Sequence, residues 1–277
     1  MAGASNLKRL SALYSGLPIV VTGGEGSFGQ ALQAAIKSFG GVPISVDLEK
    51  GSSGSDHFFR CDIRDADAFA ETLAAIESAH GKIGCVIANA AIDMTAEAHQ
   101  LTPEDWRSII ETNLIGTTNL IALTYPAMQA RRSGDILIAS SGSSLISFPF
   151  GLPYTSSKAA QLALSLGLRS EAKRYGVNVS CAVLPSLTTD GTNLSEVSAE
   201  PKAGLNRSGF LNALPGRPYD MNEAALKALK GLDQRKGRII FPMALALTAR
   251  LVGLFPSFGA AIRDDVAKRF ERYGQAK

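Results

Sequence analysis

Short apolar runs alternate with segments of helical periodicity along most of this chain, and no other feature limits its fold as strongly. The runs are typical of buried β-strands, because they are short, rich in Val and Ile, and bounded by glycine or polar residues. They lie at residues 17–23, 42–48, 57–63, 83–90, 135–140, 177–185 and 238–241. Helical patterns occupy residues 27–41 and 65–81, about 153–175, and two segments that begin near Thr102 and Asp220. Since parallel strands need helix-sized connections, this alternation predicts an α/β fold: a Rossmann-type, doubly wound parallel sheet of about seven strands with helices on both faces.

Composition predicts one domain over residues 1–277 and small-molecule partners. The formal net charge is +3 and no basic run exceeds two adjacent residues, so we expect no nucleic-acid partner. The cysteines lie in apolar strand-like contexts, which indicates buried thiols in a reducing compartment; they are Cys61, Cys85 and Cys181. No signal-peptide pattern opens the chain, so we expect a cytoplasmic protein. The histidines show no metal-ligand spacing, and no metal is expected; they are His57, His80 and His99.

Three spaced glycines, Gly23, Gly26 and Gly29, stand between the first expected strand and the first expected helix. A bare turn at this place lets the backbone approach a pyrophosphate, which the helix N-terminus then binds through its free N–H groups. Tight turns also use glycine for conformational reasons alone. Asp47 ends the second strand eighteen residues after Gly29, where a carboxylate accepts hydrogen bonds from the adenosine ribose. With Glu25 as a second negative charge, or else a merely solvated one, the pattern favours NAD over NADP.

Tyr154 and Lys158 are four residues apart on an expected helix, so they share one face. An ammonium group beside a phenol stabilises the phenolate, which makes tyrosine usable as an acid or base near neutral pH. An isolated pair at this spacing is equally typical of a solvated helix face. The neighbouring motifs therefore decide its meaning.

These motifs together resemble the short-chain dehydrogenase/reductase family over about residues 18–241. The glycine turn appears as Thr22-Gly23-Gly24-Glu25-Gly26-Ser27-Phe28-Gly29, the acidic strand end as Asp47, the adenine-contacting motif as Asp62-Ile63, and the Asn-Ala-Gly motif as Asn89-Ala90-Ala91. The family's active-site set matches Asn113, Ser141, Tyr154 and Lys158. Pro185 matches the turn after the sixth strand, with Thr188 or Thr189 placed to reach the nicotinamide.

The resemblance implies hydride transfer between a secondary alcohol or ketone and NAD. Tyr154 would then exchange a proton with the substrate oxygen, while Lys158 would bind the nicotinamide ribose and lower the tyrosine pKa. Ser141 would hydrogen-bond the substrate oxygen, and Asn113 would hold a proton-relay water. Taken one at a time, these serine and asparagine positions are also typical of turns and caps.

Several positions depart from the family pattern. Ser27 stands where shorter members have glycine, and the resulting spacing resembles sugar-nucleotide-modifying members, so an epimerase or dehydratase that retains NAD is the alternative function. A catalytically silent NAD-binding protein is a third, which the intact active-site set argues against. Ala91 and Ser186 also replace glycines of the family motifs. We expect the polar segment 186–218 to be the substrate loop.

The last segment, residues 242–277, is expected to be a helical tail. It is largely apolar from Met243 to Ile262, but Arg250 and Pro256 interrupt it, so we do not expect a spanning helix. It resembles tails of family members that act on lipophilic alcohols and ketones, some of them membrane-associated. This favours a hydrophobic substrate and peripheral membrane contact. A subunit interface, or a helix that covers the core, is an equally favoured role of the tail, and the two roles can hold together; we expect a homodimer or homotetramer.

Overall fold

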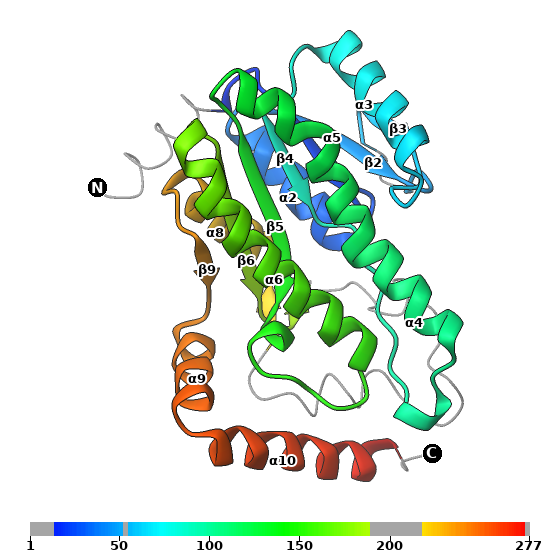
Figure 1. Cartoon of the computed structure of the whole chain (residues 1–277), viewed down its shortest axis with the longest axis vertical. Helices are drawn as coiled ribbons and strands as arrows, with labels where there is room; N and C mark the ends of the chain where they lie inside the picture. Colours follow the sequence, from blue (N-terminus) through cyan, green and yellow to red (C-terminus); the bar gives the residue numbers. More distant parts are fainter. Residues whose placement is uncertain (1–13, 52–54, 189–217, 275–277) are drawn as a thin grey trace.

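The computed structural model describes residues 14–51, 55–188 and 218–274, and its main feature is one parallel sheet (Figure 1). Seven strands lie in the order β3-β2-β1-β4-β5-β6-β9. Their bounds are Pro18–Thr22 (β1), Val42–Asp47 (β2), Phe58–Arg60 (β3), Cys85–Ala88 (β4), Asp135–Ser141 (β5), Asn178–Leu184 (β6) and Arg238–Ile240 (β9). The strand order changes direction between β1 and β4, which is where doubly wound sheets bind ligands. The predicted fold class is confirmed.

Helices cover both faces of this sheet. They are Ser27–Ser38 (α2), Ala66–His80 (α3), Pro103–Ile110 (α4), Gly116–Ala130 (α5), Leu152–Ala172 (α6), Met221–Asp233 (α8), Met243–Leu254 (α9) and Pro256–Gly274 (α10). Short 3₁₀ turns span Ala98–Gln100 (η1), Gly142–Ser144 (η3) and Lys173–Tyr175 (η4), and a π-helical turn spans Glu111–Ile115 (η2). Apolar side chains of α2 and α8 pack on one face of the sheet. Those of α3, α5 and α6 pack on the other, which gives two buried layers around the strands.

The helix starts follow the capping signals in the sequence. The Thr102 side chain accepts a hydrogen bond from the Asp105 N–H, and the Asp105 side chain accepts one from the Thr102 N–H, ahead of Pro103 in the first turn. Asp220 caps α8 by accepting from the N–H of Glu223. Both helices therefore begin where the sequence predicted, because the cap satisfies N–H groups that the helix leaves free.

Two segments differ from the sequence-based expectation. The third strand is shorter than 57–63, because the Asp62 carboxylate accepts the N–H of Arg64 and turns the chain toward the start of α3. At the start of the expected loop 186–218, Leu187–Thr188 (β7) pairs in parallel with Tyr219–Asp220 (β8), which follows the loop directly; both strands are too short to show a strand pattern. Residues 189–217 of that loop lie outside the described residues.

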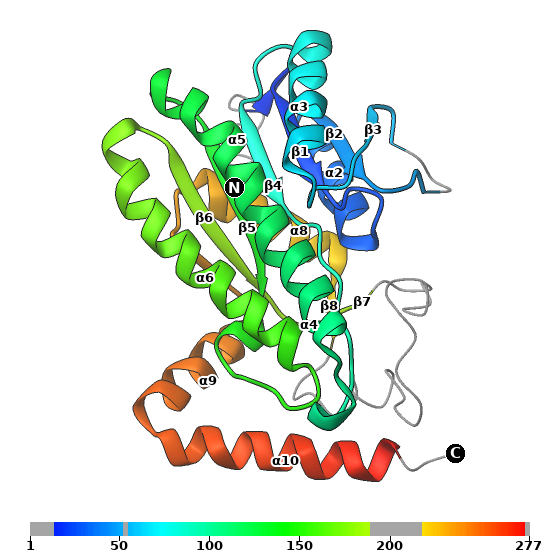
Figure 2. The ribbon, with the colours of Figure 1, turned by 45° about the vertical axis from the view of Figure 1, so that its right-hand side comes forward.

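The C-terminal tail forms α9 and α10, at the end of the molecule where α4 and α6 begin (Figures 1 and 2). That end holds the carboxyl ends of the parallel strands. Among the described residues, none of the helices combines the length and apolar character that a membrane span requires. Every residue of α9 keeps some exposure, and its outer side presents Met243, Leu247, Leu251 and Leu254.

Candidate active site

The glycine turn after β1 is packed so tightly that two of its positions admit only glycine. A Cβ on Gly29 would lie 2.1 Å from the carbonyl oxygen of Gly23, and Gly23 itself has a φ of 63° and faces the backbone of Ala90. Gly26 differs, because the nearest atom to a Cβ there is the Gly23 oxygen at 3.5 Å. Gly23 and Gly29 thus build the turn, while Gly26 faces open space.

The start of α2 is free to bind an anion. Gly26 is its N-cap and supplies no side-chain hydrogen bond, and the first turn, with Ser27 and Phe28, contains no acidic residue. The N–H groups of this first turn and the positive end of the helix dipole therefore favour a negatively charged ligand.

Asp47 lies at the carboxyl end of β2, beside this turn. Its Oδ2 accepts a hydrogen bond of 3.0 Å from the backbone N–H of Glu25, and its Oδ1 accepts one of 2.8 Å from the N–H of Leu48. Burial raises the pKa of the Asp47 carboxyl above its usual value, and the two N–H donors oppose this shift. A hydrogen bond therefore joins the acidic strand end to the glycine turn, while the role of Asp47 toward a ribose stays a prediction.

Glu25 is held by several donors rather than solvated. Its Oε1 accepts hydrogen bonds of 2.6 Å from the hydroxyls of Ser45 and Ser55, and its Oε2 accepts one of 2.9 Å from the N–H of Gly51. These donors outweigh partial burial and hold the Glu25 pKa below its usual value. Glu25 therefore links the glycine turn to β2 and to the loop that follows β2, and keeps its charge there.

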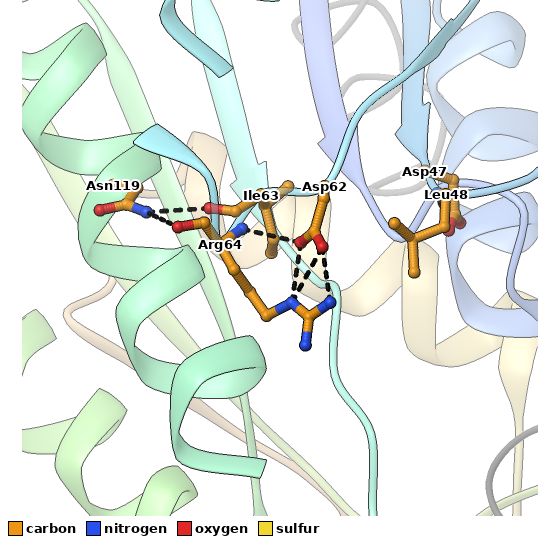
Figure 3. Close-up of polar contacts among 6 residues, drawn as sticks. All are labelled: Asp47, Leu48, Asp62, Ile63, Arg64 and Asn119. Carbon is orange, nitrogen blue, oxygen red and sulfur yellow. Dashed lines mark hydrogen bonds and ion pairs between the residues drawn. The ribbon is translucent and has the colours of Figure 1, made fainter. Parts of the chain in front are cut away.

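Asp62 and Ile63, the expected adenine contacts, follow β3 (Figure 3). The Asp62 carboxylate pairs with Arg64, whose Nη2 donates to Oδ2 at 2.6 Å and whose Nε donates to both oxygens. This pair lowers the pKa of Asp62. Figure 3 shows Leu48 and Asp47 on the opposite side of Asp62 from the Asn119 side chain. An adenine at Asp62 would therefore meet Arg64 as well, a neighbour that the motif did not suggest.

Asn119 of α5 fixes the loop that carries these residues. Its Nδ2 donates to the carbonyl of Ile63 at 2.9 Å and to that of Arg64 at 3.2 Å. Sequence reasoning missed Asn119, because a polar residue within a helix gives no signal until its partner loop is known.

Thr22 and Asn89 join β1 to β4 at the point where the strand order changes. The N–H groups of Asn89 and Ala90 donate to the Thr22 hydroxyl at 3.1 and 3.2 Å, and the Asn89 amide donates to the Gly23 carbonyl at 3.0 Å. The expected residues Asn89 and Ala90 therefore brace the glycine turn directly.

Tyr154 and Lys158 lie one turn apart near the start of α6, and the Lys158 Nζ is 5.5 Å from the centre of the Tyr154 ring. Nζ also donates a hydrogen bond of 2.9 Å to the carbonyl of Ala139 in β5. Lys158 is 3% exposed, and burial lowers its pKa to about 8, although Cys181 and Asp93 act in the opposite direction. The tyrosine and lysine therefore share one face of the helix, and the lysine releases its proton at a lower pH than an exposed lysine does.

Ser141 ends β5, two residues after the carbonyl that Lys158 binds, and pairs with Leu184 next to Pro185. Its Oγ accepts the N–H of Ser143 at 3.2 Å. A Cβ on the neighbouring Gly142 would lie 3.3 Å from Leu245 of α9. The tail thus reaches the loop that carries Ser141.

Asn113 lies in the π-helical turn η2 and is 0% exposed. Its side chain accepts from the N–H of Ile92 at 2.8 Å and donates to the Ile92 carbonyl at 2.9 Å and to the Ser157 hydroxyl at 2.9 Å. Asn113 therefore connects the loop after β4 to α6, and its role toward a relay water stays a prediction.

Two further expected residues lie at the same edge of the sheet. Pro185 follows β6, and Thr188 belongs to β7, where it pairs with Asp220. Thr189 lies outside the described residues. The predicted positions thus lie at or just after the carboxyl ends of β1 to β6, and in α2, η2, α6 and β7.

A family model described as short chain dehydrogenase matches residues 18–200. The L-fucose dehydrogenase of Oryctolagus cuniculus is 26% identical over 226 residues, which covers 78% of this chain and 79% of that enzyme. A gluconate 5-dehydrogenase from Burkholderia cenocepacia, solved with NADP and tartrate, aligns with a TM-score of 0.70 and 21% identity over 84% of this chain and 96% of that one. A short chain dehydrogenase from Leptospira borgpetersenii with bound NAD+ has a TM-score of 0.69 and 19% identity over 82% and 91% of the two chains. The two solved structures thus share this fold.

Proposed function

The chain belongs to the short chain dehydrogenase family, an oxidoreductase family, and from this premise we propose that it transfers a hydride between a secondary alcohol or ketone and NAD. One observation carries the proposal. Lys158 binds the carbonyl of Ala139, two residues before Ser141, and lies 5.5 Å from the Tyr154 ring. The proton-exchanging tyrosine, its lysine and the serine therefore meet at one edge of the sheet.

The residues present fit a dinucleotide. The N-terminus of α2 has no side-chain cap, and a Cβ at Gly26 would meet only the Gly23 oxygen, at an ordinary contact distance of 3.5 Å. Asp47 stands beside the turn with its carboxylate held by two N–H donors, which leaves further lone pairs for ribose hydroxyls. A dinucleotide held by these residues would supply a nicotinamide as the hydride acceptor for an alcohol or the hydride donor for a ketone.

NAD is proposed over NADP because of charge. Asp47 is buried beside the turn, and Glu25 keeps its charge nearby. A 2′-phosphate placed between these carboxylates would meet repulsion from both, which costs affinity. The gluconate 5-dehydrogenase of similar fold was solved with NADP, so the fold alone does not decide between the two cofactors. The proposal of NAD therefore depends on the carboxylates of Asp47 and Glu25.

The protein's part in the reaction is to hold the substrate oxygen and move its proton. Tyr154 exchanges the proton at that oxygen, and Ser141 donates a hydrogen bond to it. Lys158 binds the nicotinamide ribose, and when protonated it lowers the pKa of the phenol beside it. Its buried position, with a pKa of about 8, suits this task because a modest pH change decides its charge.

A hydrophobic substrate is proposed from the apolar side chains near Ser141. Leu145 and Leu245 are partly buried and pack against the core cluster that contains Leu162, and Leu245 comes from the tail and lies against Gly142. Apolar surface next to one polar anchor is the usual form of a small-molecule site. The sugar-nucleotide epimerase alternative finds no support here, since the relatives described above are dehydrogenases.

The test is absorbance at the reduced-nicotinamide band. Purified protein is mixed with NAD and with a panel of secondary alcohols, from steroids and aryl alcohols to sugar alcohols, and with NADP in parallel. We expect reduction of NAD by an apolar alcohol, and none by the variant Tyr154→Phe. Turnover confined to sugar alcohols would reject the hydrophobic substrate, and bound NAD that never exchanges would reject the proposed reaction.

A further inference from the structure

The side chain of Asn113 connects two segments of the candidate site, the loop after β4 and the first turns of α6. The position of Asn113 itself depends on a second buried amide side chain, that of Gln161. Its side chain holds both backbone groups of Ile92 and the hydroxyl of Ser157. The Ser157 hydroxyl in turn donates to the carbonyl of Tyr154 at 2.7 Å. Whatever fixes Asn113 therefore also fixes the loop after β4 and the helical turn that carries the tyrosine.

Gln161 of α6 supplies that second amide. Its Nε2 donates to the main-chain carbonyl of Asn113 at 2.6 Å and to the Thr117 hydroxyl at 2.8 Å. The Thr117 hydroxyl donates to the same Asn113 carbonyl at 2.7 Å. Gln161 is 0% exposed, so these bonds form away from water. Because π-helical turns interrupt the regular hydrogen-bond ladder, side-chain donors at this carbonyl help to fix the turn.

The other end of the Gln161 amide is unsatisfied. Its Oε1 is buried and accepts no hydrogen bond from any described residue. A buried acceptor without a partner costs free energy, which an apolar side chain of similar length would avoid. The unsatisfied Oε1 therefore gives glutamine no advantage over an apolar side chain. The feature that distinguishes glutamine at this position is the pair of hydrogen bonds that its Nε2 donates.

We propose that Gln161 is a positioning residue of the reaction, a role that rests on the proposed function. It fixes the Asn113 carbonyl, and through the Asn113 side chain it holds Ile92 of the loop after β4 and Ser157, which lies between Tyr154 and Lys158 in α6. The Oδ1, Nδ2 and carbonyl oxygen of Asn113 already have protein partners. A water held by Asn113 has to share one of these atoms, so Gln161 also limits where a proton relay can run.

The variant Gln161→Met tests this, because methionine keeps the length of the side chain and removes the amide. We expect kcat to fall about tenfold, as for lost hydrogen bonds in a positioned site, with KM and the NAD dissociation constant within about twofold of wild type. The melting temperature should change little, because the loss of two Nε2 hydrogen bonds and the removal of the orphan oxygen act in opposite directions. The pH profile of kcat should shift, since the relay path changes.

A merely structural glutamine gives a different result. In that case Gln161→Met lowers the melting temperature and leaves kcat and its pH profile within twofold of wild type, which overturns the proposal. Ser165→Ala is the matched control, because Ser165 is buried on the same helix and its hydroxyl hydrogen-bonds the carbonyl of Leu162 and the Cys181 thiol, neither of which belongs to the Asn113 contacts. This control should keep kcat unchanged.

Two additions keep the test decisive if Gln161→Met folds poorly or if no substrate is found. Thr117→Val removes the other donor to the Asn113 carbonyl and should lower kcat about threefold, in the same direction. Hydrogen exchange of Gln161→Met needs no activity: segments 89–95 and 111–117 should exchange faster, while β1 and β2 do not change. If hydrogen exchange in Gln161→Met is the same as in wild type, the positioning role is overturned. If the wild-type protein turns over none of the alcohols tested, only the proposed function is overturned.

Discussion

The backbone N–H of Glu25 donates a hydrogen bond of 3.0 Å to the carboxylate of Asp47. The bond joins the middle of the glycine turn to the end of β2, two segments 22 residues apart in the sequence. The bond places the half-buried Asp47 carboxylate beside the N-terminus of α2. The group that would bind the ribose of a dinucleotide and the group that would bind its phosphates are therefore connected directly.

Asp47→Ala should weaken NAD binding by roughly tenfold to a hundredfold, the size of lost hydrogen bonds to a charged group. It should weaken NADP binding less, because a repelling charge disappears along with a hydrogen-bond acceptor. Titration calorimetry with both cofactors measures the ratio of the two affinities. Asp56→Ala is a control, since Asp56 is exposed and pairs with Lys37 on the surface. An unchanged ratio in Asp47→Ala would remove Asp47 from the cofactor site.

Gly26→Ala and Gly29→Ala should separate cofactor binding from folding. A Cβ at Gly26 has its nearest neighbour at 3.5 Å, so this variant should fold normally and bind NAD about tenfold more weakly. A Cβ at Gly29 meets the Gly23 oxygen at 2.1 Å, so that variant should lose roughly 1–3 kcal/mol or more of unfolding free energy. Urea unfolding and NAD titration distinguish the two. Equal stability losses in both variants would contradict the assignment of Gly26 to the ligand side.

Tyr154→Phe should bind NAD within about twofold of wild type, because only the hydroxyl is lost. Turnover should fall roughly 10²–10⁴-fold, the usual contribution of a positioned acid or base. Tyr175→Phe, beyond the far end of the same helix, should keep full turnover. Substantial turnover by Tyr154→Phe would mean that another group moves the proton.

Stability should depend on pH through Lys158. Burial lowers its folded-state pKa to about 8 from 10.5. Below pH 8 both states carry the proton, and the cost of burying the cation is fully present. Between pH 8 and 10.5 the unfolded chain keeps its proton and the folded chain releases it, so the contribution of Lys158 to unfolding free energy rises with pH.

Lys158→Met should remove this rise. The measurement is urea unfolding of wild type and variant from pH 7 to 11, taken as a difference so that other groups cancel. Lys236→Met, at an exposed position, should reproduce the wild-type curve. A difference that stays flat across the window would show that the buried lysine does not titrate there.

The sheet was predictable because its strands are continuous apolar runs, and a strand buried on both faces has no other pattern. The helix starts at Thr102 and Asp220 were predictable because capping is local chemistry. β7 and β8 were not, since two residues carry no periodicity. The third strand ended early because Asp62 turns toward Arg64, a local bond that competes with the ladder.

The site divides in the same way. Asp47, Tyr154 and Lys158 lie in motifs that the sequence shows directly. Gln161 and Asn119 lie in no such motif, because each binds a backbone carbonyl that is distant in the chain. Gln161 binds that of Asn113, 48 residues away, and Asn119 binds that of Ile63, 56 residues away. A polar residue at a position that the helical pattern predicts to be buried could have indicated Gln161 as a candidate. The sequence pattern would still not have predicted which group it binds.

The helix α9 contacts the loop that carries Ser141 but is itself weakly packed. It holds Leu245 against Gly142, next to Ser141, yet none of its own residues is buried. Elements with little buried surface open at a lower free-energy cost than the sheet they cover. We therefore expect α9 to detach and reattach many times between global unfolding events, so the apolar side chains beside Ser141 become exposed more readily than the sheet; under the proposed function, this opening would let an apolar substrate in.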